Sequence, residues 1–241
     1  MLSTPVKMKK EPFSSWRPSQ QSWKHRFQQP YQFQLPQGDI LTLDQAPFTS
    51  KTSKDPGDTG CTLWDSSLVL AQLLLNKPEW VKDKRVVELG SGIGLLGFLI
   101  SILGARQTTL SDLDSTLNLL RGNMVKNKHL LGNKDIQIML IEWGDQKVLQ
   151  QPTLQNTEVV VCSDLVYRME SVQPLVSTLC KLCNLKTKIL FAQDNHRPEV
   201  TQTWERTMQP YFHYHTIPKE WLHPEIQSED IIVRIYQKID W

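Results

Sequence analysis

The 241-residue sequence has no apolar run long enough to span a membrane, and residues 1–11 lack the apolar core of a secretory signal peptide. It has no long run of Lys or Arg and a formal net charge of only +2, which argues against a general nucleic-acid surface. It has only four cysteines, and Cys180 and Cys183 form a lone C-x-x-C in a segment with helical periodicity. We therefore expect buried reduced thiols and no metal site. These absences favour the cytoplasm, with the nucleus as the alternative.

The chain divides into three parts. Residues 1–30 mix Pro, Gln, Ser and charged residues, so we expect an N-terminal extension that is partly disordered. Its tryptophans favour an alternative, in which the segment is an arm that docks on a partner or on the domain itself. Residues 31–60 predict a β-hairpin around Pro36 to Asp39, followed by a polar loop at 49–60. Residues 61–241 are long enough for one compact domain.

From residue 64 onward, segments with helical periodicity alternate with short apolar runs. Runs such as 159–162 do not alternate, which is typical of strands covered on both faces in a parallel sheet. The last two strands have no helix between them, so we expect an antiparallel strand at the C-terminus. The predicted fold is α/β and Rossmann-like, with a mostly parallel seven-stranded sheet and helices on both faces. The predicted helices are 65–76, 94–103, 114–127, 169–183 and 198–209, and the predicted strands are 85–89, 107–111, 136–141, 158–163, 187–193, 211–217 and 231–237.

A glycine-rich turn follows the first of these strands. Gly90, Ser91 and Gly92 come directly after strand 85–89 and before an apolar helix. A turn of this kind lets a ligand approach the backbone closely at the carboxyl edge of a parallel sheet. The segment is therefore a candidate cofactor site.

Two classes of cofactor use such a turn. Gly92, Gly94 and Gly97 match the dinucleotide fingerprint, with Asp112 as a ribose partner about 20 residues on. Glu88 favours the other class, S-adenosylmethionine, because an acid here repels a pyrophosphate and suits a ligand with ammonium and sulfonium groups. The nicotinamide enzymes also need a substrate domain for which the chain has no room.

Asp112 ends the second predicted strand of the sheet. A carboxylate at this position can accept both hydroxyls of a ribose in a bidentate contact. Asp114 is the competing acid, but its place before a helical stripe predicts a helix cap. We therefore assign the ribose contact to Asp112.

The fourth predicted strand ends in an Asp-x-x-Tyr motif, Asp164 to Tyr167. Together with the glycine-rich turn that Glu88 opens and with the segment 62–65, this motif resembles the seven-β-strand protein lysine methyltransferases known as methyltransferase family 16. The resemblance extends from about residue 31 to residue 238. It implies S-adenosylmethionine as cofactor and no metal. It also implies a protein substrate that carries the target lysine, such as an AAA ATPase, a chaperone or a translation factor.

The resemblance also implies roles for individual residues. Asp164 and Tyr167 would face the target lysine as catalytic residues. Arg168 replaces the aromatic or acidic residue that often follows this Tyr, so the resemblance does not identify the substrate protein. We expect a monomer. The predicted cofactor-binding residues are Trp64, Glu88, Gly90, Ser91, Gly92, Asp112, Trp143 and Ser163.

Other interpretations of the same residues stay open. Trp64 and Trp143 could be core tryptophans, Tyr167 could serve packing alone, and Asp164 could cap the following helix. The segment 194–197 lies at the same sheet edge and is either a polar surface loop or a selector of substrates. The function could instead be methylation of arginine or a small molecule, cofactor binding without activity, or nicotinamide-dependent oxidoreduction.

Overall fold

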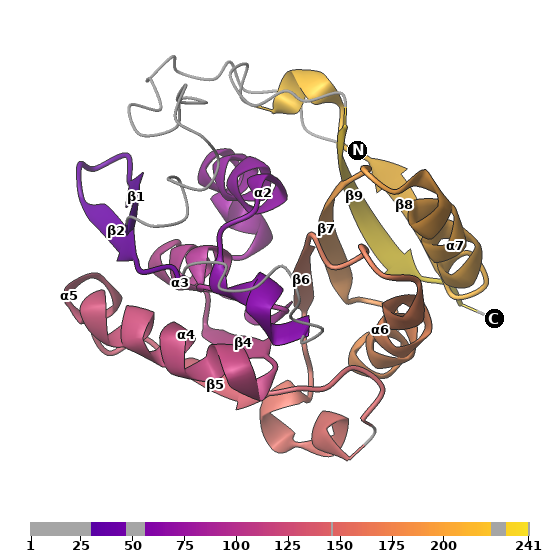
Figure 1. Cartoon of the computed structure of the whole chain (residues 1–241), viewed down its shortest axis with the longest axis horizontal. Helices are drawn as coiled ribbons and strands as arrows, with labels where there is room; N and C mark the ends of the chain where they lie inside the picture. The colour runs from indigo at the N-terminus through magenta and orange to yellow at the C-terminus, as the bar shows by residue number, and fades with distance from the viewer. Residues whose placement is uncertain (1–29, 47–55, 146, 223–229, 241) are drawn as a thin grey trace.

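The computed structural model describes residues 30–46, 56–145, 147–222 and 230–240, without the side chains of 56–58 and 148. A seven-stranded sheet of order β5-β4-β3-β6-β7-β9-β8 forms its centre (Figure 1). The neighbours from β5 to β7 are parallel, whereas β9 is antiparallel to both β7 and β8. The strands are β3 (Arg85–Leu89), β4 (Gln107–Asp112), β5 (Ile136–Leu140), β6 (Val159–Ser163), β7 (Lys188–Asp194), β8 (Phe212–Thr216) and β9 (Ile231–Lys238).

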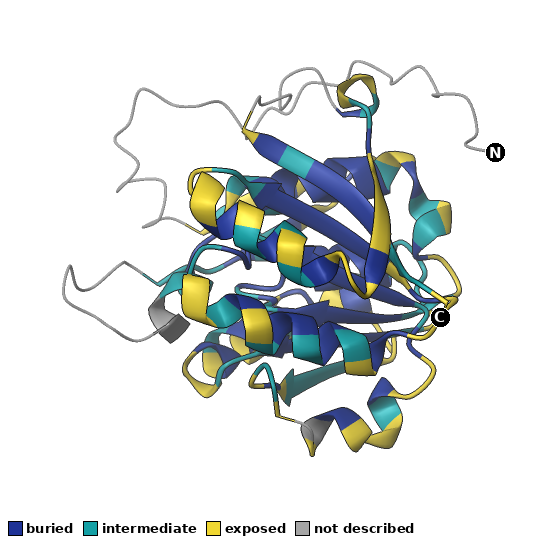
Figure 2. Ribbon diagram, turned by 90° about the vertical axis from the view of Figure 1, so that its right-hand side faces the viewer, coloured by how far each residue is buried: buried dark blue, intermediate teal, exposed yellow. Residues whose placement is uncertain are grey.

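Helices cover both faces of this sheet. One apolar core lies between the sheet and α2, α3, α4 and the N-terminal hairpin, and a second lies between the sheet and α6 and α7. In Figure 2 the strands are mostly buried and the outer faces of the helices are exposed. The helices are α2 (Asp65–Asn76), α3 (Leu95–Ile102), α4 (Asp114–Lys126), α5 (Lys128–Leu131), α6 (Met169–Leu182) and α7 (Pro198–Met208).

The predicted α/β fold is confirmed, because all five predicted helices and all seven predicted strands occur with small differences at their ends. The antiparallel C-terminal strand is also confirmed, and β9 lies between β7 and β8. The short α5 was not predicted. The polar loop at 49–60 is wrong in its last part, where Pro56–Cys61 is a 3₁₀ helix, and 49–55 lies outside the described residues. Asp114 is the first residue of α4 and not its cap.

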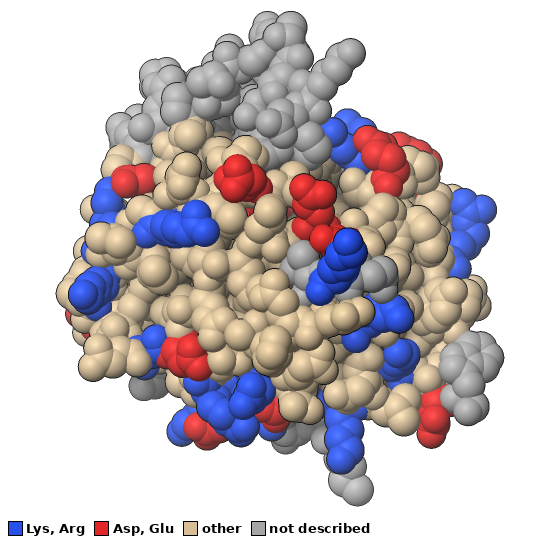
Figure 3. Space-filling model, turned by 90° about the horizontal axis from the view of Figure 1, so that it is seen from below, with Lys and Arg blue, Asp and Glu red and all other residues tan. Residues whose placement is uncertain are grey.

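The extension at 1–29 lies outside the described residues. Among the residues that are described, no helix combines the length and the apolar character needed to cross a bilayer. None of the four cysteines forms a disulfide among the described residues, and Cys183 is buried. On the face seen from below, acidic and basic side chains are interspersed (Figure 3).

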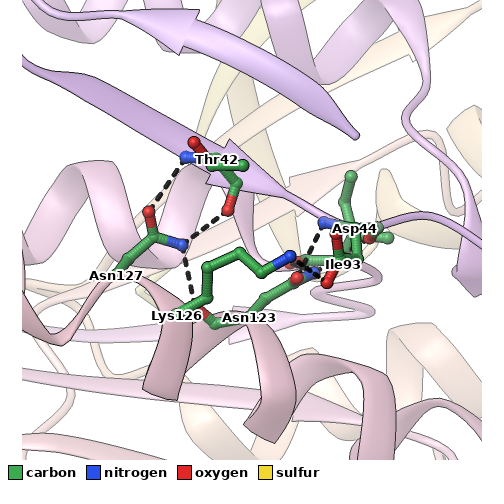
Figure 4. A network of polar contacts seen from close by, with 6 residues as sticks. All are labelled: Thr42, Asp44, Ile93, Asn123, Lys126 and Asn127. Carbon is green, nitrogen blue, oxygen red and sulfur yellow. Dashed lines mark hydrogen bonds and ion pairs between the residues drawn. The ribbon is translucent and has the colours of Figure 1, made fainter. Parts of the chain in front are cut away.

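A hairpin of β1 (Tyr31–Gln34) and β2 (Ile40–Leu43) packs against α4. Asn127, fully buried, accepts a hydrogen bond from the Thr42 N–H at 2.9 Å and donates one to the Thr42 carbonyl at 2.7 Å. Asn123 makes the same pair of bonds to the Asp44 backbone, at 2.8 and 3.0 Å (Figure 4). The two amides thus satisfy the edge of β2 as a neighbouring strand would. These bonds anchor the hairpin, and with it the segment after β2, to the end of α4.

Candidate active site

All ten predicted site residues line one cavity of about 630 Å³. It lies at the carboxyl ends of β3, β4, β6 and β7, where side chains from neighbouring parallel strands converge. Its volume falls in the range of about 300–1,000 Å³ that is common for small-molecule sites. The location of these residues follows the prediction, while their individual roles stay predictions.

The glycine-rich turn forms one wall of the cavity. Gly90 and Gly92 have φ angles of 62° and 54°, a left-handed conformation that glycine adopts without strain. The close approaches here come from the chain itself. A Cβ on Gly90 would lie 2.4 Å from the Leu165 side chain, and one on Gly92 would lie 3.0 Å from the Gly60 carbonyl oxygen. Glycine is thus required at both positions before any ligand is considered.

Asp112 joins the end of β4 to this turn. Its Oδ2 accepts a hydrogen bond from the Gly92 N–H at 2.7 Å, and its Oδ1 accepts one from the Leu113 N–H at 2.8 Å. Burial raises the pKa of the Asp112 carboxyl above its ordinary value. The Thr116 side chain also hydrogen-bonds to this carboxyl, so of its roughly four acceptor sites about one remains for a hydroxyl donor from the cavity.

Glu88 lies behind the turn and is only 3% exposed. Burial raises the pKa of its carboxyl to about 8, so the group is mostly protonated at neutral pH when no cation is near. Glu88 therefore carries the negative charge expected from the sequence only when a cation is near it or the pH is higher. Its Oε2 is buried without a hydrogen-bond partner among the described residues and lies beside Gly97 of α3, while the residue as a whole lines the cavity.

The two tryptophans lie at the rim of the cavity. Trp64 is 40% exposed, and its Nε1 donates a hydrogen bond to the Thr59 carbonyl at 3.0 Å. This exposure excludes an ordinary core position for Trp64. Trp143 is half-buried and packs against the core beneath α6. Both residues thus line the cavity without being fully buried.

Asp164 follows β6 and has a φ angle of 54°, which is uncommon outside glycine and is found at functional sites. Its N–H donates a hydrogen bond to the Ala192 carbonyl at 3.0 Å, and its Oδ1 accepts one from the Asp194 N–H at 3.0 Å. Burial raises the pKa of this carboxyl. The helix-cap alternative is wrong, because Arg168 precedes α6 as its cap residue. Both the end of β7 and Ser66 of α2 therefore hold the Asp164 carboxyl in place.

Ser163 and Tyr167 flank Asp164 along the chain. The Ser163 hydroxyl lies 3.0 Å from the Ser67 hydroxyl of α2. The Tyr167 hydroxyl lies 3.0 Å from the Thr59 hydroxyl, and the Arg168 guanidinium lies 5.6 Å from the centre of the Tyr167 ring. The Tyr167 ring is thus already close to one cation.

Several lining residues were not predicted. Thr59 and Gly60 fall in a segment that was predicted as a plain polar loop, and only the proximity of Gly60 to Trp64 could have drawn attention to it. Asp194 lies at the end of β7 and pairs with His196 at 2.9 Å between its Oδ2 and Nε2. This pair brings the segment 194–197 to the cavity rim, as its place after a strand had suggested.

The lining is strongly acidic. Among the described residues it contains one arginine, Arg197, and seven carboxyl side chains. Such a wall suits a cationic ligand and disfavours the pyrophosphate of a dinucleotide. The described residues contain no group of three or more His, Cys, Asp or Glu arranged to hold a metal ion. The seven acids are Asp65, Glu88, Asp112, Glu142, Asp164, Glu170 and Asp194.

The strand order and the cavity at the sheet edge define an α/β protein with the methyltransferase fold. The crystal structure of a TehB-like SAM-dependent methyltransferase from Corynebacterium glutamicum shares this fold. It superposes with a TM-score of 0.51 at 12% sequence identity, over 75% of this chain and 91% of that one.

The lysine methyltransferase family model matches residues 43–209, and the chain belongs to this family. It is 29% identical over 150 residues to EEF1A lysine methyltransferase 3 of Xenopus tropicalis, covering 62% of this chain and 64% of the relative. It is 30% identical over 164 residues to the protein-lysine N-methyltransferase EEF2KMT of Mus musculus, covering 64% and 48% respectively. The chain thus spans about half to two thirds of the length of these relatives.

Proposed function

We propose that this protein is an S-adenosylmethionine-dependent protein-lysine N-methyltransferase. Membership of the lysine methyltransferase family supports this function. The observation that carries it is the shared cavity, which has Asp112 and the glycine-rich turn in one part and Asp164 and Tyr167 in the other. A methyl donor and an acceptor amine could therefore meet inside one enclosed space.

The cavity residues fit S-adenosylmethionine. When bound, this cofactor supplies an electrophilic methyl group on a sulfonium sulfur. The acidic lining, which includes Glu88, suits its positive charges, and the Asp112 carboxyl can accept a ribose hydroxyl. The rings of Trp64 and Trp143 offer apolar surface for its adenine.

Asp164 orients the amine that receives the methyl group. A lysine amine must lose its proton before it attacks, and its pKa in water is about 10.4. Burial of the amine and the positive charge of a sulfonium cofactor beside it both disfavour the ammonium and lower this pKa. Asp164, held by the Asp194 N–H at its Oδ1 and by Ser66 of α2, accepts a hydrogen bond from the amine and aims its lone pair. The Tyr167 ring stabilises the methylated ammonium by a cation–π contact.

The substrate is a protein, as the names of the relatives indicate for those enzymes. Two parts of the chain, 167–175 and 217–231, resemble the family member that acts on valosin-containing protein, an AAA ATPase. That ATPase is the first substrate to test. The protein acts as a monomer in the cytoplasm, on protein and not on nucleic acid, with residues 61–241 as its catalytic domain and 1–30 as an extension.

Incubation of a cell lysate with labelled S-adenosylmethionine and this protein tests the proposal. We expect label on a lysine side chain of one or a few proteins, identified by peptide mass spectrometry. Label on arginine or on a small molecule would instead support a methyltransferase of another class. Calorimetry that detects binding of NAD and not of S-adenosylmethionine would contradict the cofactor.

A further inference from the structure

Residues 59–64, called the strap below, connect the two parts of the cavity. Five of these six residues line it, namely Thr59, Gly60, Thr62, Leu63 and Trp64. The strap is tied to the chain that follows the hairpin, because the Cys61 carbonyl accepts a hydrogen bond from the Ala46 N–H at 3.1 Å. The Leu63 N–H also donates to the Gln45 side chain at 2.8 Å. The strap therefore has a defined position that does not depend on the cavity contents.

On the cofactor side, the strap lies directly on the glycine-rich turn. A Cβ on Gly60 would lie 2.8 Å from the Thr116 hydroxyl oxygen of α4 and 3.5 Å from Asp112 Oδ1. The Gly60 carbonyl oxygen in turn occupies the space next to Gly92. No side chain fits between the strap and the turn, so the strap is seated against the elements that would hold the cofactor.

On the lysine side, the strap reaches Tyr167 through a single residue. The Thr59 hydroxyl lies 3.0 Å from the Tyr167 hydroxyl, which is a hydrogen bond in which either group can donate. The Thr59 carbonyl accepts the indole N–H of Trp64 at 3.0 Å. Thr59 thus joins a residue of the predicted cofactor site to a residue of the predicted catalytic site.

We propose that Thr59 is a positioning residue, which holds the Tyr167 hydroxyl so that the strap sets the place of the Tyr167 ring beside the target lysine. A ring held before the substrate arrives loses no rotational freedom when it binds, which favours the reactive arrangement. The inference rests on the proposed lysine methyltransferase function. It predicts that Thr59 affects transfer to lysine more than it affects cofactor binding, because Gly60 keeps the strap on the turn.

Four variants test the inference: Thr59→Val, Thr59→Ser, Tyr167→Phe and the double variant Thr59→Val with Tyr167→Phe. Thr59→Val keeps the shape and removes the hydroxyl, so we expect a drop of about threefold to tenfold in kcat on a lysine substrate. Thr59→Ser should restore the rate. The double variant should be no slower than the slower single variant, because both remove the same hydrogen bond. The affinity for S-adenosylmethionine should stay within about twofold in all four, since the loss of one hydroxyl contact at the far part of the cavity leaves the turn intact.

Thr203→Val is the matched control, because the Thr203 hydroxyl bonds within α7 on the exposed surface. It should leave the rate unchanged. A Thr59→Val variant as fast as the wild type would overturn the inference. So would single effects on kcat that multiply fully in the double variant.

Amide hydrogen exchange in the strap gives a readout that needs no substrate. Thr59→Val and Tyr167→Phe should each speed exchange of the strap amides by the same factor, about fivefold, with no further increase in the double variant. If the wild type methylates no lysine, the proposed function fails, yet this exchange pattern still tests the contact. Unchanged exchange in both single variants would overturn the positioning role even where lysine is methylated.

Discussion

The carboxylate of Asp112 accepts a hydrogen bond from the backbone N–H of Gly92 across 2.7 Å, which ties the end of β4 to the turn after β3. If the same carboxylate also accepts ribose hydroxyls, Asp112→Ala removes two contributions to cofactor affinity. We expect the Kd for S-adenosylmethionine to rise about 10- to 100-fold, as is typical of lost charge-assisted hydrogen bonds. Isothermal titration calorimetry measures this change.

Asp114→Ala is the control for that experiment. Asp114 is exposed, begins α4 and is not among the residues that line the cavity, so its removal should change the Kd by less than about twofold. Equal effects of the two substitutions would remove Asp112 from the cofactor site.

Glu88 should make the stability of the ligand-free protein depend on pH. Its folded-state pKa of about 8 lies above the ordinary value of 4.5, so the folded state binds a proton that the unfolded state releases between these values. This stabilisation is fully present below the ordinary value and is lost as the pH rises through about 8. Between about pH 6 and pH 8 we expect the free energy of unfolding to fall by about 2 kcal/mol from this group. Urea denaturation at both pH values measures it.

Glu88→Gln should remove this part of the pH dependence, because the amide does not titrate. Glu220→Gln, at an exposed position in the short helix Lys219–Trp221, should leave it in place. A Glu88→Gln variant with the full wild-type slope would show that another group is responsible.

The hairpin depends on Asn127 for its attachment to α4. Asn127→Ala leaves the N–H and the carbonyl of Thr42 without their partner and opens space in a buried position. We expect a loss of about 2–3 kcal/mol in the free energy of unfolding, measured by chemical denaturation. Asn118→Ala, an exposed asparagine on the same helix, should cost less than about 0.5 kcal/mol. Similar losses in both variants would argue that the anchor contributes little.

Much of the fold follows from local patterns in the sequence. The strand, turn and helix from 85 to 103 were predicted to within a residue or two, because an apolar run, three glycines and a helical segment succeed one another. Pro56–Cys61 could not be predicted, since a short 3₁₀ helix has no periodicity to detect. Asn123 and Asn127 are polar residues of a type usually found on the exposed face of a helix. Their burial is explained only by the hairpin that packs against them.

The site, like the fold, has features that the sequence predicts and features that depend on tertiary structure. Motifs placed Asp112 and Asp164 at the ends of the two strands that flank β3, because parallel strands bring their carboxyl ends to one edge. The protonation of Glu88 depends on burial, and the hold of Asp194 on Asp164 depends on the pairing of β6 with β7. The contact between Thr59 and Tyr167 joins residues 108 apart in the sequence, so no local pattern contains it.

The central claim is that Asp164 presents a lysine amine to a methyl donor in the shared cavity, and Asp164→Asn tests it most directly. Asn tolerates the left-handed backbone at this position, and its oxygen would take the place of Oδ1 opposite the Asp194 N–H. Its NH₂ group would then be a donor where the carboxylate accepts hydrogen bonds, which removes an acceptor for the amine and for Ser66. The decisive measurement is the rate at which labelled methyl enters lysine at saturating S-adenosylmethionine. We expect a fall of about 100-fold or more, with cofactor affinity within about threefold. A variant that labels lysine as fast as the wild type would contradict the account.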